Sequence, residues 1–144
     1  ERAVDILAAY LDDSNRPITL RLAASSGMMT LGKNRHLYSE EARQRAVTAL
    51  CHAVEHDHWE PVRAVSSLAL MSLGEKRAIG ILERVASHEL ETRAQREMRV
   101  AAHALRTGDK SEEQLKLLRK DLDQVREENR KLKEQLGAIE ARIK

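Results

Sequence analysis

The sequence predicts an all-α protein, an α-solenoid of three helical hairpins followed by a long coiled-coil helix. Three observations lead to this prediction. Charged residues make up 33% of the 144 residues, with only six glycines and two prolines, a composition typical of long amphipathic helices. Aromatic residues reach only 2%, so the core must be built from aliphatic and small side chains. From residue 115 onward, apolar residues recur at the spacing of a helix that pairs with another helix.

An internal repeat organises residues 1–108. Three segments begin with Arg-Ala followed by a β-branched residue, and all three end in leucine: residues 2–7, 45–50 and 77–82. Each segment opens a helical pattern that runs to a turn with acidic or histidine residues, at 12–13, 56–57 and 88–89. One such unit cannot bury its apolar face alone, so we expect the units to stack around a continuous core.

A second helix follows each of these segments. Pro17 and Pro61 begin two of the second helices, because the first helical turn does not need the N–H group that proline lacks. We expect these helices to end at Gly32 and Gly74, since glycine readily adopts the left-handed conformation after a helix. Ser39 is expected to cap the next helix after a surface loop.

The pattern of the second helices resembles the HEAT and HEAT-like repeat family. It consists of a proline, the pair Val62-Arg63, an Ala/Leu-rich helix and a closing Leu73-Gly74. The resemblance covers residues 1–108 and implies three stacked hairpins. The third copy, residues 91–107, lacks the proline, as expected of a terminal capping repeat.

Residues 109–144 form the second predicted domain, a coiled-coil dimerisation helix. Gly108 is expected to end the last solenoid helix, and Ser111 with Gln114 forms a capping box for a new one. An unbroken stripe then follows the a and d positions of a heptad repeat. This stripe, the predicted dimer interface, is called the seam below and comprises Leu115, Leu118, Leu122, Val125, Asn129, Leu132, Leu136, Ile139 and Ile143.

The polar member of the seam favours a parallel homodimer, because two Asn129 side chains can form a hydrogen bond across the axis of an aligned pair. In that arrangement Asp121 faces Arg126 of the other helix, and Glu128 faces Lys133. The alternatives are packing of the seam onto the solenoid or onto other domains of a longer protein, antiparallel pairing, and a trimer.

One short pattern indicates metal binding. His52, Glu55 and His56 match H-x-x-E-H, in which two histidines on one helix face chelate zinc beside a carboxylate base. The alternative is an ordinary solvent-facing helix edge, since His52 and His56 align with Ala9 and Asp13 of the first repeat. These three residues are the metal candidate of the sequence, which predicts no catalytic or cofactor-binding residue.

Several surface residues have two interpretations. Trp59 either anchors a partner or wedges one repeat against the next, and Cys51 is expected to pack as a small apolar residue. Arginines on the repeat edges either line a surface for an acidic partner or are merely solvated: Arg43, Arg63, Arg84, Arg93 and Arg99.

The net charge and the cysteine content indicate which kinds of binding partner and which cellular compartment fit this chain. The net charge of +2 is spread without a basic block, which speaks against a dedicated nucleic-acid or membrane surface. No apolar run approaches the ~18 residues of a membrane span. The single Cys51 excludes an internal disulfide and is compatible with a reducing compartment, so we expect a cytoplasmic protein.

Residues 75–144 show a more particular resemblance. The run EKRAI at 75–79, the helix at 93–105 and the ending LDQVREENRKLKEQL at 122–136 resemble the C-terminal end of bacterial zinc aminopeptidases of the alanyl-aminopeptidase family. Those enzymes carry HEAT-like repeats and a charged helical tail. Their zinc motif, H-E-x-x-H with a downstream glutamate, is absent from this sequence, so the resemblance assigns no catalytic residue here.

These observations predict a non-catalytic scaffold or assembly fragment of a larger protein, because Glu1 rather than methionine opens an already periodic helix. The resemblance implies that the parent is a zinc aminopeptidase that removes N-terminal residues from peptides. The alternative is a HEAT-like protein- or nucleic-acid-binding module unrelated to a peptidase.

Overall fold

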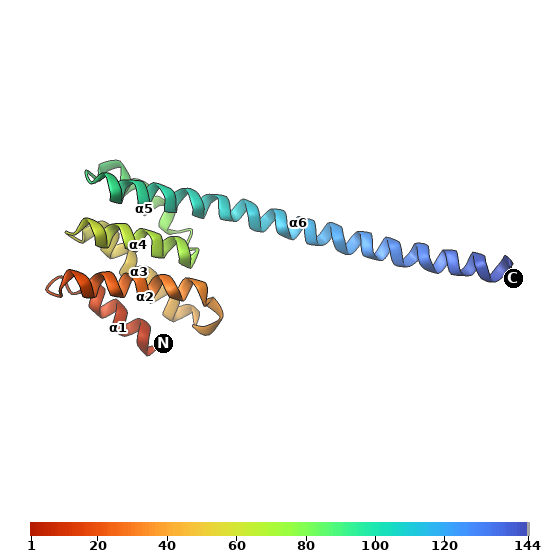
Figure 1. Ribbon diagram of the computed structural model, residues 1–144, viewed down its shortest axis with the longest axis horizontal. Helices are drawn as coiled ribbons and strands as arrows, with labels where there is room; N and C mark the ends of the chain where they lie inside the picture. The colour runs from red at the N-terminus through yellow and green to blue at the C-terminus, as the bar shows by residue number, and fades with distance from the viewer. Residues whose placement is uncertain (144) are drawn as a thin grey trace. The chain divides into compact units, whose positions relative to one another are not determined.

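A computed structural model describes residues 1–143, with the side chains of residue 35 and residues 109–112 left out. The described residues form six α-helices and one short 3-10 helix, and contain no strand, which confirms the all-α prediction. In chain order they are α1 (Arg2–Asp12), α2 (Ile18–Lys33), η1 (Arg35–Leu37), α3 (Glu40–His56), α4 (Glu60–Leu73), α5 (Ala78–His88) and α6 (Thr92–Ile143) (Figure 1).

The chain divides into two compact units, Glu1–Gly108 and a second unit from Asp109 onward. In the first unit α1 packs against α2, and α3 packs against α4. The two helix pairs lie side by side, since α1 also contacts α3 and α2 contacts α4 (Figure 1). The first turns of α6 pack with α5, where Arg106 forms an ion pair with Glu83 and the Gln95 side chain donates to the carbonyl of Ala86 at 3.0 Å.

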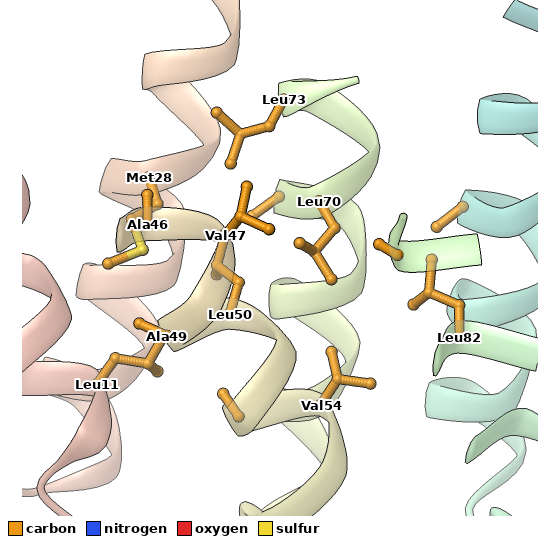
Figure 2. Close-up of a cluster of buried hydrophobic side chains, with 14 of the residues drawn as sticks. Leu11, Met28, Ala46, Val47, Ala49, Leu50, Val54, Leu70, Leu73 and Leu82 are labelled. Carbon is orange, nitrogen blue, oxygen red and sulfur yellow. The ribbon is translucent and has the colours of Figure 1, made fainter. Parts of the chain in front are cut away.

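The core of the first unit consists of aliphatic and small side chains, as the composition requires. Met28, Leu50, Leu70 and Leu82 are fully buried, and Figure 2 shows them between helices that are distant in the sequence. Small residues let α2 and α4 approach closely. Between these helices the hydroxyls of Ser25 and Ser66 lie 3.0 Å apart, so both buried polar groups have a partner.

Several local signals place the helix ends as predicted. α2 starts directly after Pro17, and Pro61 lies in the first turn of α4. The hydroxyl of Ser39 accepts a hydrogen bond from the Ala42 backbone N–H at 3.2 Å, which caps α3. Gly74 follows α4 with φ 66° and ψ 31°, the left-handed conformation that glycine adopts without steric cost.

The prediction that Gly32 ends a helix is wrong. Gly32 lies inside α2, which continues to Lys33. A Cβ atom at this position would lie 2.3 Å from the carbonyl oxygen of Ser72 on α4. Glycine is therefore required here because two backbones come together, although the Leu-Gly pair looks the same in the sequence as the one at Gly74.

The predicted break after Gly108 is also wrong. α6 is a single helix of 52 residues that passes through Gly108 and Ser111, so Ser111 caps no helix. A glycine inside a helix costs only about 1 kcal/mol relative to alanine. The helix extends past that residue because nucleation has already occurred, and each further residue then adds a backbone hydrogen bond.

Candidate functional site

The seam residues all lie on α6, within the second unit. Its eight apolar side chains are between 48% and 80% exposed, and Asn129 is exposed as well. Such a row of exposed aliphatic side chains is unusual for a solvated helix and is typical of a surface that another helix covers. The structure thus places the predicted interface on one helix face, and its pairing with a second helix stays a prediction.

The charges of this helix differ in how far they are paired within it. On the outer face, Arg130 forms ion pairs with Glu127 and Glu134 along the helix. Next to the seam, Arg126 lies 3.9 Å from Asp123 and Glu128 accepts a hydrogen bond from Gln124 at 3.2 Å. Also next to the seam, Asp121 and Lys133 form no ion pair with any described residue.

The candidate metal residues lie at the end of α3 without forming a ligand set. The imidazole rings of His52 and His56 have centroids 4.8 Å apart, but His52 Nδ1 lies 3.5 Å from Asp12 Oδ1. The carboxylate of Glu55 is engaged by Arg84 of α5. Among the described residues no group of three or more His, Cys, Asp or Glu side chains is arranged to hold a metal ion.

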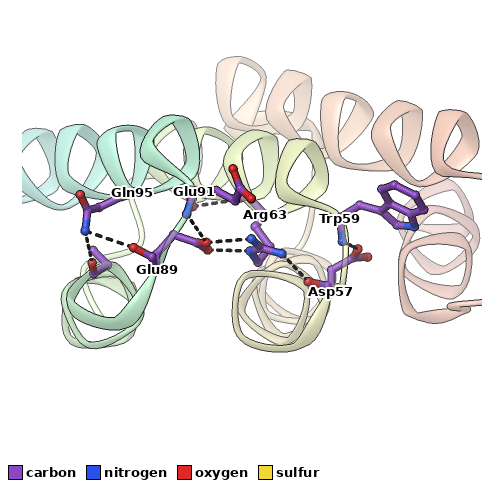
Figure 3. A network of polar contacts seen from close by, with 8 residues as sticks. Asp57, Trp59, Arg63, Glu89, Glu91 and Gln95 are labelled. Carbon is purple, nitrogen blue, oxygen red and sulfur yellow. Dashed lines mark hydrogen bonds and ion pairs between the residues drawn. The ribbon is translucent and has the colours of Figure 1, made fainter.

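A polar network joins the turn after α3 to the turn after α5 (Figure 3). Arg63 of α4 donates from Nε and Nη2 to the two carboxylate oxygens of Glu89 at 2.7 and 2.8 Å. Its Nη1 donates to the carbonyl oxygen of Asp57 at 2.9 Å. This two-pronged contact is the strong geometry for an arginine and a carboxylate, so Arg63 ties one helix pair to the next.

A similar contact joins α2 to the turn after α3. Arg21, which aligns with Arg63 in the sequence, forms an ion pair with Asp57, and both side chains are only 4% exposed. Gln95, at the start of α6, donates to the carbonyl of Glu89 in the preceding turn at 3.3 Å. Arginines of α2 and α4 thus reach the turns after α3 and α5, and the start of α6 carries a glutamine instead.

Sequence reasoning missed this role of Arg21 and Arg63. The alignment of the two arginines and of the acidic turn residues Asp57 and Glu89 was the available signal. What the sequence does not reveal is that α2 reaches the turn after α3 and that α4 reaches the turn after α5. Arg63 was expected to be an edge residue, and it proves to be a largely buried structural contact.

The ion pair changes the acidity of Glu89. Burial alone would raise the pKa of this carboxyl, but the hydrogen bonds from Arg63 and from the Glu91 backbone N–H oppose it, and the net effect is a lowered pKa. Glu89 therefore stays ionised at neutral pH.

An open hollow of about 700 Å³ lies between the same two turns. Its walls include His56, His58 and His88, together with the pairs Arg63–Glu89 and Arg84–Glu55. Both arginines of the lining are already paired with a glutamate, so neither is available to hold an anionic ligand.

Trp59 is exposed to solvent, whereas Cys51 is partly buried. Trp59 is 54% exposed, and its backbone N–H donates to Asp57 Oδ1 at 2.9 Å, so its backbone is fixed while its ring faces solvent. Burial raises the pKa of the Cys51 thiol to about 11, with Glu55 and Glu75 adding to the shift. At neutral pH Cys51 is therefore an unreactive thiol.

No protein-family model, curated protein or solved structure matches this chain. Within residues 1–143, none of the helices combines the length and the apolar character needed to span a lipid bilayer.

Proposed function

We propose that this chain is a non-catalytic assembly module, a HEAT-like solenoid of three hairpins joined to a helix that forms a parallel homodimeric coiled coil. The observation that carries the proposal is the seam, an uninterrupted a/d stripe whose apolar side chains are at least 48% exposed in a single chain. A globular helix buries a wider apolar face against its own core, whereas this stripe is as narrow as a coiled-coil interface.

The apolar side chains of the seam are the main source of association energy in the proposed dimer. Burying the exposed half of a leucine or isoleucine side chain contributes about 1 kcal/mol. Eight such side chains from each of two helices would contribute about 16 kcal/mol before the entropic cost of association is subtracted.

The charges beside the seam favour parallel over antiparallel pairing. The e positions carry Arg119, Arg126, Lys133 and Glu140, while the charged g positions are Asp121, Glu128 and Arg142. In a parallel pair g faces e, so Asp121 meets Arg126 and Glu128 meets Lys133. In an antiparallel pair centred on Asn129, Arg126 would meet Lys133 and Glu128 would meet its own equivalent, and only the contact between Arg119 and Glu140 would join opposite charges.

The forward links Arg21–Asp57 and Arg63–Glu89 support the solenoid part of the proposal. Both connect the second helix of one pair to the turn of the next pair, at the same place in the repeat. A stack in which each unit contacts only its neighbours is the defining property of a solenoid. The resemblance to zinc aminopeptidases stays a prediction, since the zinc motif of that family is absent from this sequence.

Two adjacent leucines provide a matched test of the seam. Leu118 belongs to the seam and Leu117 does not, yet the two are 64% and 63% exposed. Light scattering over a dilution series should show a weaker dimer for Leu118→Ala and an unchanged dimer for Leu117→Ala. Replacing Leu122 and Leu132 together by alanine should raise the dimer dissociation constant by a hundredfold or more, because about 2 kcal/mol or more is lost per buried leucine.

A wild-type chain that stays monomeric at every concentration would refute the homodimer. Equal effects of Leu117→Ala and Leu118→Ala would refute the assignment of the seam.

A further inference from the structure

The outward side of the first part of α6 carries cations without partners. Arg93, Arg96 and Arg99 are exposed, and none of the three forms a hydrogen bond or ion pair with any residue that the structure describes. His103 is exposed and lies on the same side at helical spacing. These four residues are called the basic face below, and they lie in the first unit, outside the seam.

The basic face differs from most of this unit, in which, among the described arginines outside the face, only Arg2 lacks a partner. Eight other arginines each have a carboxylate partner, namely Arg16–Asp13, Arg21–Asp57, Arg43–Glu40, Arg45–Asp5, Arg63–Glu89, Arg77–Glu75, Arg84–Glu55 and Arg106–Glu83. Of the arginines named in the sequence as possible contacts for an acidic partner, Arg43, Arg63 and Arg84 are therefore already occupied. Arg93 and Arg99 remain.

No carboxylate interrupts the basic face. The exposed positions between residues 92 and 107 contain arginine, histidine, threonine and valine but no aspartate or glutamate, and Glu97 is only partly exposed. From Arg93 to His103 the face extends about 15 Å along the helix. Val100, 44% exposed, lies in the middle of it.

We propose that the basic face docks an acidic amphipathic helix of a partner protein. Carboxylates three and four residues apart on such a helix are about 5–6 Å apart, which matches the spacing of Arg93, Arg96 and Arg99 along α6. The planar guanidinium of arginine binds a carboxylate through two parallel hydrogen bonds. An apolar side chain between the partner's acidic residues would pack on Val100.

The same features disfavour a nucleic acid as the occupant. Binding of single strands relies on several aromatic side chains that stack on successive bases, and the basic face offers only the imidazole of His103. A duplex binder neutralises many phosphates and depends on a strongly positive field, whereas this chain has a net charge of only +2.

The test uses the full chain and a fluorescently labelled synthetic peptide. The peptide carries glutamate at every third or fourth position along one side and a leucine at its centre, and a second peptide has glutamine in place of glutamate. Polarisation should show binding of the first peptide only. The variant Arg93→Gln/Arg96→Gln/Arg99→Gln should bind it about tenfold more weakly, as three exposed ion pairs allow.

The matched control is Arg16→Gln/Arg45→Gln/Arg84→Gln, which removes the same charge from arginines that already have partners. This control should weaken binding by less than about threefold, since screening limits effects of distant charge. The charge reversal Arg96→Glu should be rescued by a peptide with arginine at the facing position.

Three outcomes would overturn the proposal: no binding of the acidic peptide, equal losses in the two triple variants, or tighter binding of a DNA duplex than of the peptide.

Discussion

At the scale of single residues, the first unit is held in register by arginines that reach forward to an acidic turn. Arg21 and Asp57 are almost completely buried, so each ion compensates a partner that water can no longer solvate. Arg63 and Glu89 repeat the contact with more exposure of the arginine. Removing one of the two ions leaves the other buried without a partner, which costs more free energy than removing both. Single and double variants can therefore test the contact.

Removing one partner of the buried Arg21–Asp57 ion pair should destabilise the first unit far more than removing both partners. Arg21→Leu is expected to destabilise the first unit by about 3–5 kcal/mol, because Asp57 would remain buried and unpaired. The double variant Arg21→Leu/Asp57→Leu should recover most of that loss. Urea unfolding followed by circular dichroism measures both, and a double variant no more stable than Arg21→Leu would contradict this account of the pair.

Glu89 should make the first unit sensitive to acid. Its pKa is lower in the folded chain than its ordinary value of 4.5, so its ionised form stabilises the fold above that pH. That stabilisation is lost as the pH falls below 4.5 and through the lowered pKa of the folded state. Unfolding free energies of wild type and Glu89→Gln should differ at neutral pH and converge in acid. A difference independent of pH would show that ionisation of Glu89 is irrelevant.

Two glycines inside helices should respond in opposite ways to alanine. Gly32→Ala would place a Cβ atom against the backbone of Ser72 and should cost about 1–3 kcal/mol by forcing α2 away from α4. At Gly80, in α5, nothing outside the helix itself lies within 4 Å of the position that a Cβ atom would take, so alanine should stabilise by about 0.5–1 kcal/mol. Melting temperatures of the two variants should therefore move to opposite sides of the wild-type value.

At the scale of helices, short-range signals predicted more than long-range ones. Pro17, Pro61 and Ser39 act through their own backbone and neighbours, and the structure places each at the helix start that its chemistry favours. The predictions for Gly32 and Gly108 were wrong because a glycine ends a helix only if nothing else favours its continuation. Contacts with another helix decided the first case, and helix propagation decided the second.

The seam and the basic face show the same difference between short-range and long-range signals. The seam is a periodic pattern on one helix, so its residues could be found without tertiary information. The basic face could not, because its meaning depends on which arginines are already paired. In the sequence Arg84 and Arg93 look alike, and only the fold shows that Glu55 lies beside the first while no described carboxylate pairs with the second.

Asn129 is expected to lower the stability of the proposed dimer and to restrict the chain to one oligomeric state. In the proposed dimer, Asn129→Val would replace a polar layer by an apolar one, so the coiled coil should become more stable. The same change removes the layer that specifies register and strand number, so trimers or mixed species should appear. Thermal unfolding and sedimentation velocity of the two chains test both effects. A dimer that is less stable with valine would show that residue 129 does not face a partner helix.

At the scale of the whole molecule, the direction of pairing decides how the two first units are presented. In a parallel dimer equivalent residues of the two helices face each other at every a position. In an antiparallel dimer centred on Asn129, a residue near one end would instead face a residue near the other end. The orientation can therefore be determined from one position well away from the centre.

Leu136→Cys should form a disulfide between two copies under mild oxidation, because residue 136 faces its own equivalent only in a parallel, register-aligned pair. The native Cys51 should not interfere, since burial raises its pKa to about 11 and leaves it protonated at neutral pH. Non-reducing electrophoresis should show a covalent dimer for Leu136→Cys and none for wild type. Leu117→Cys, on the outer side of the same helix, is the matched control. Crosslinking that is equally fast at residues 117 and 136 would reflect random collision and would refute the parallel pair.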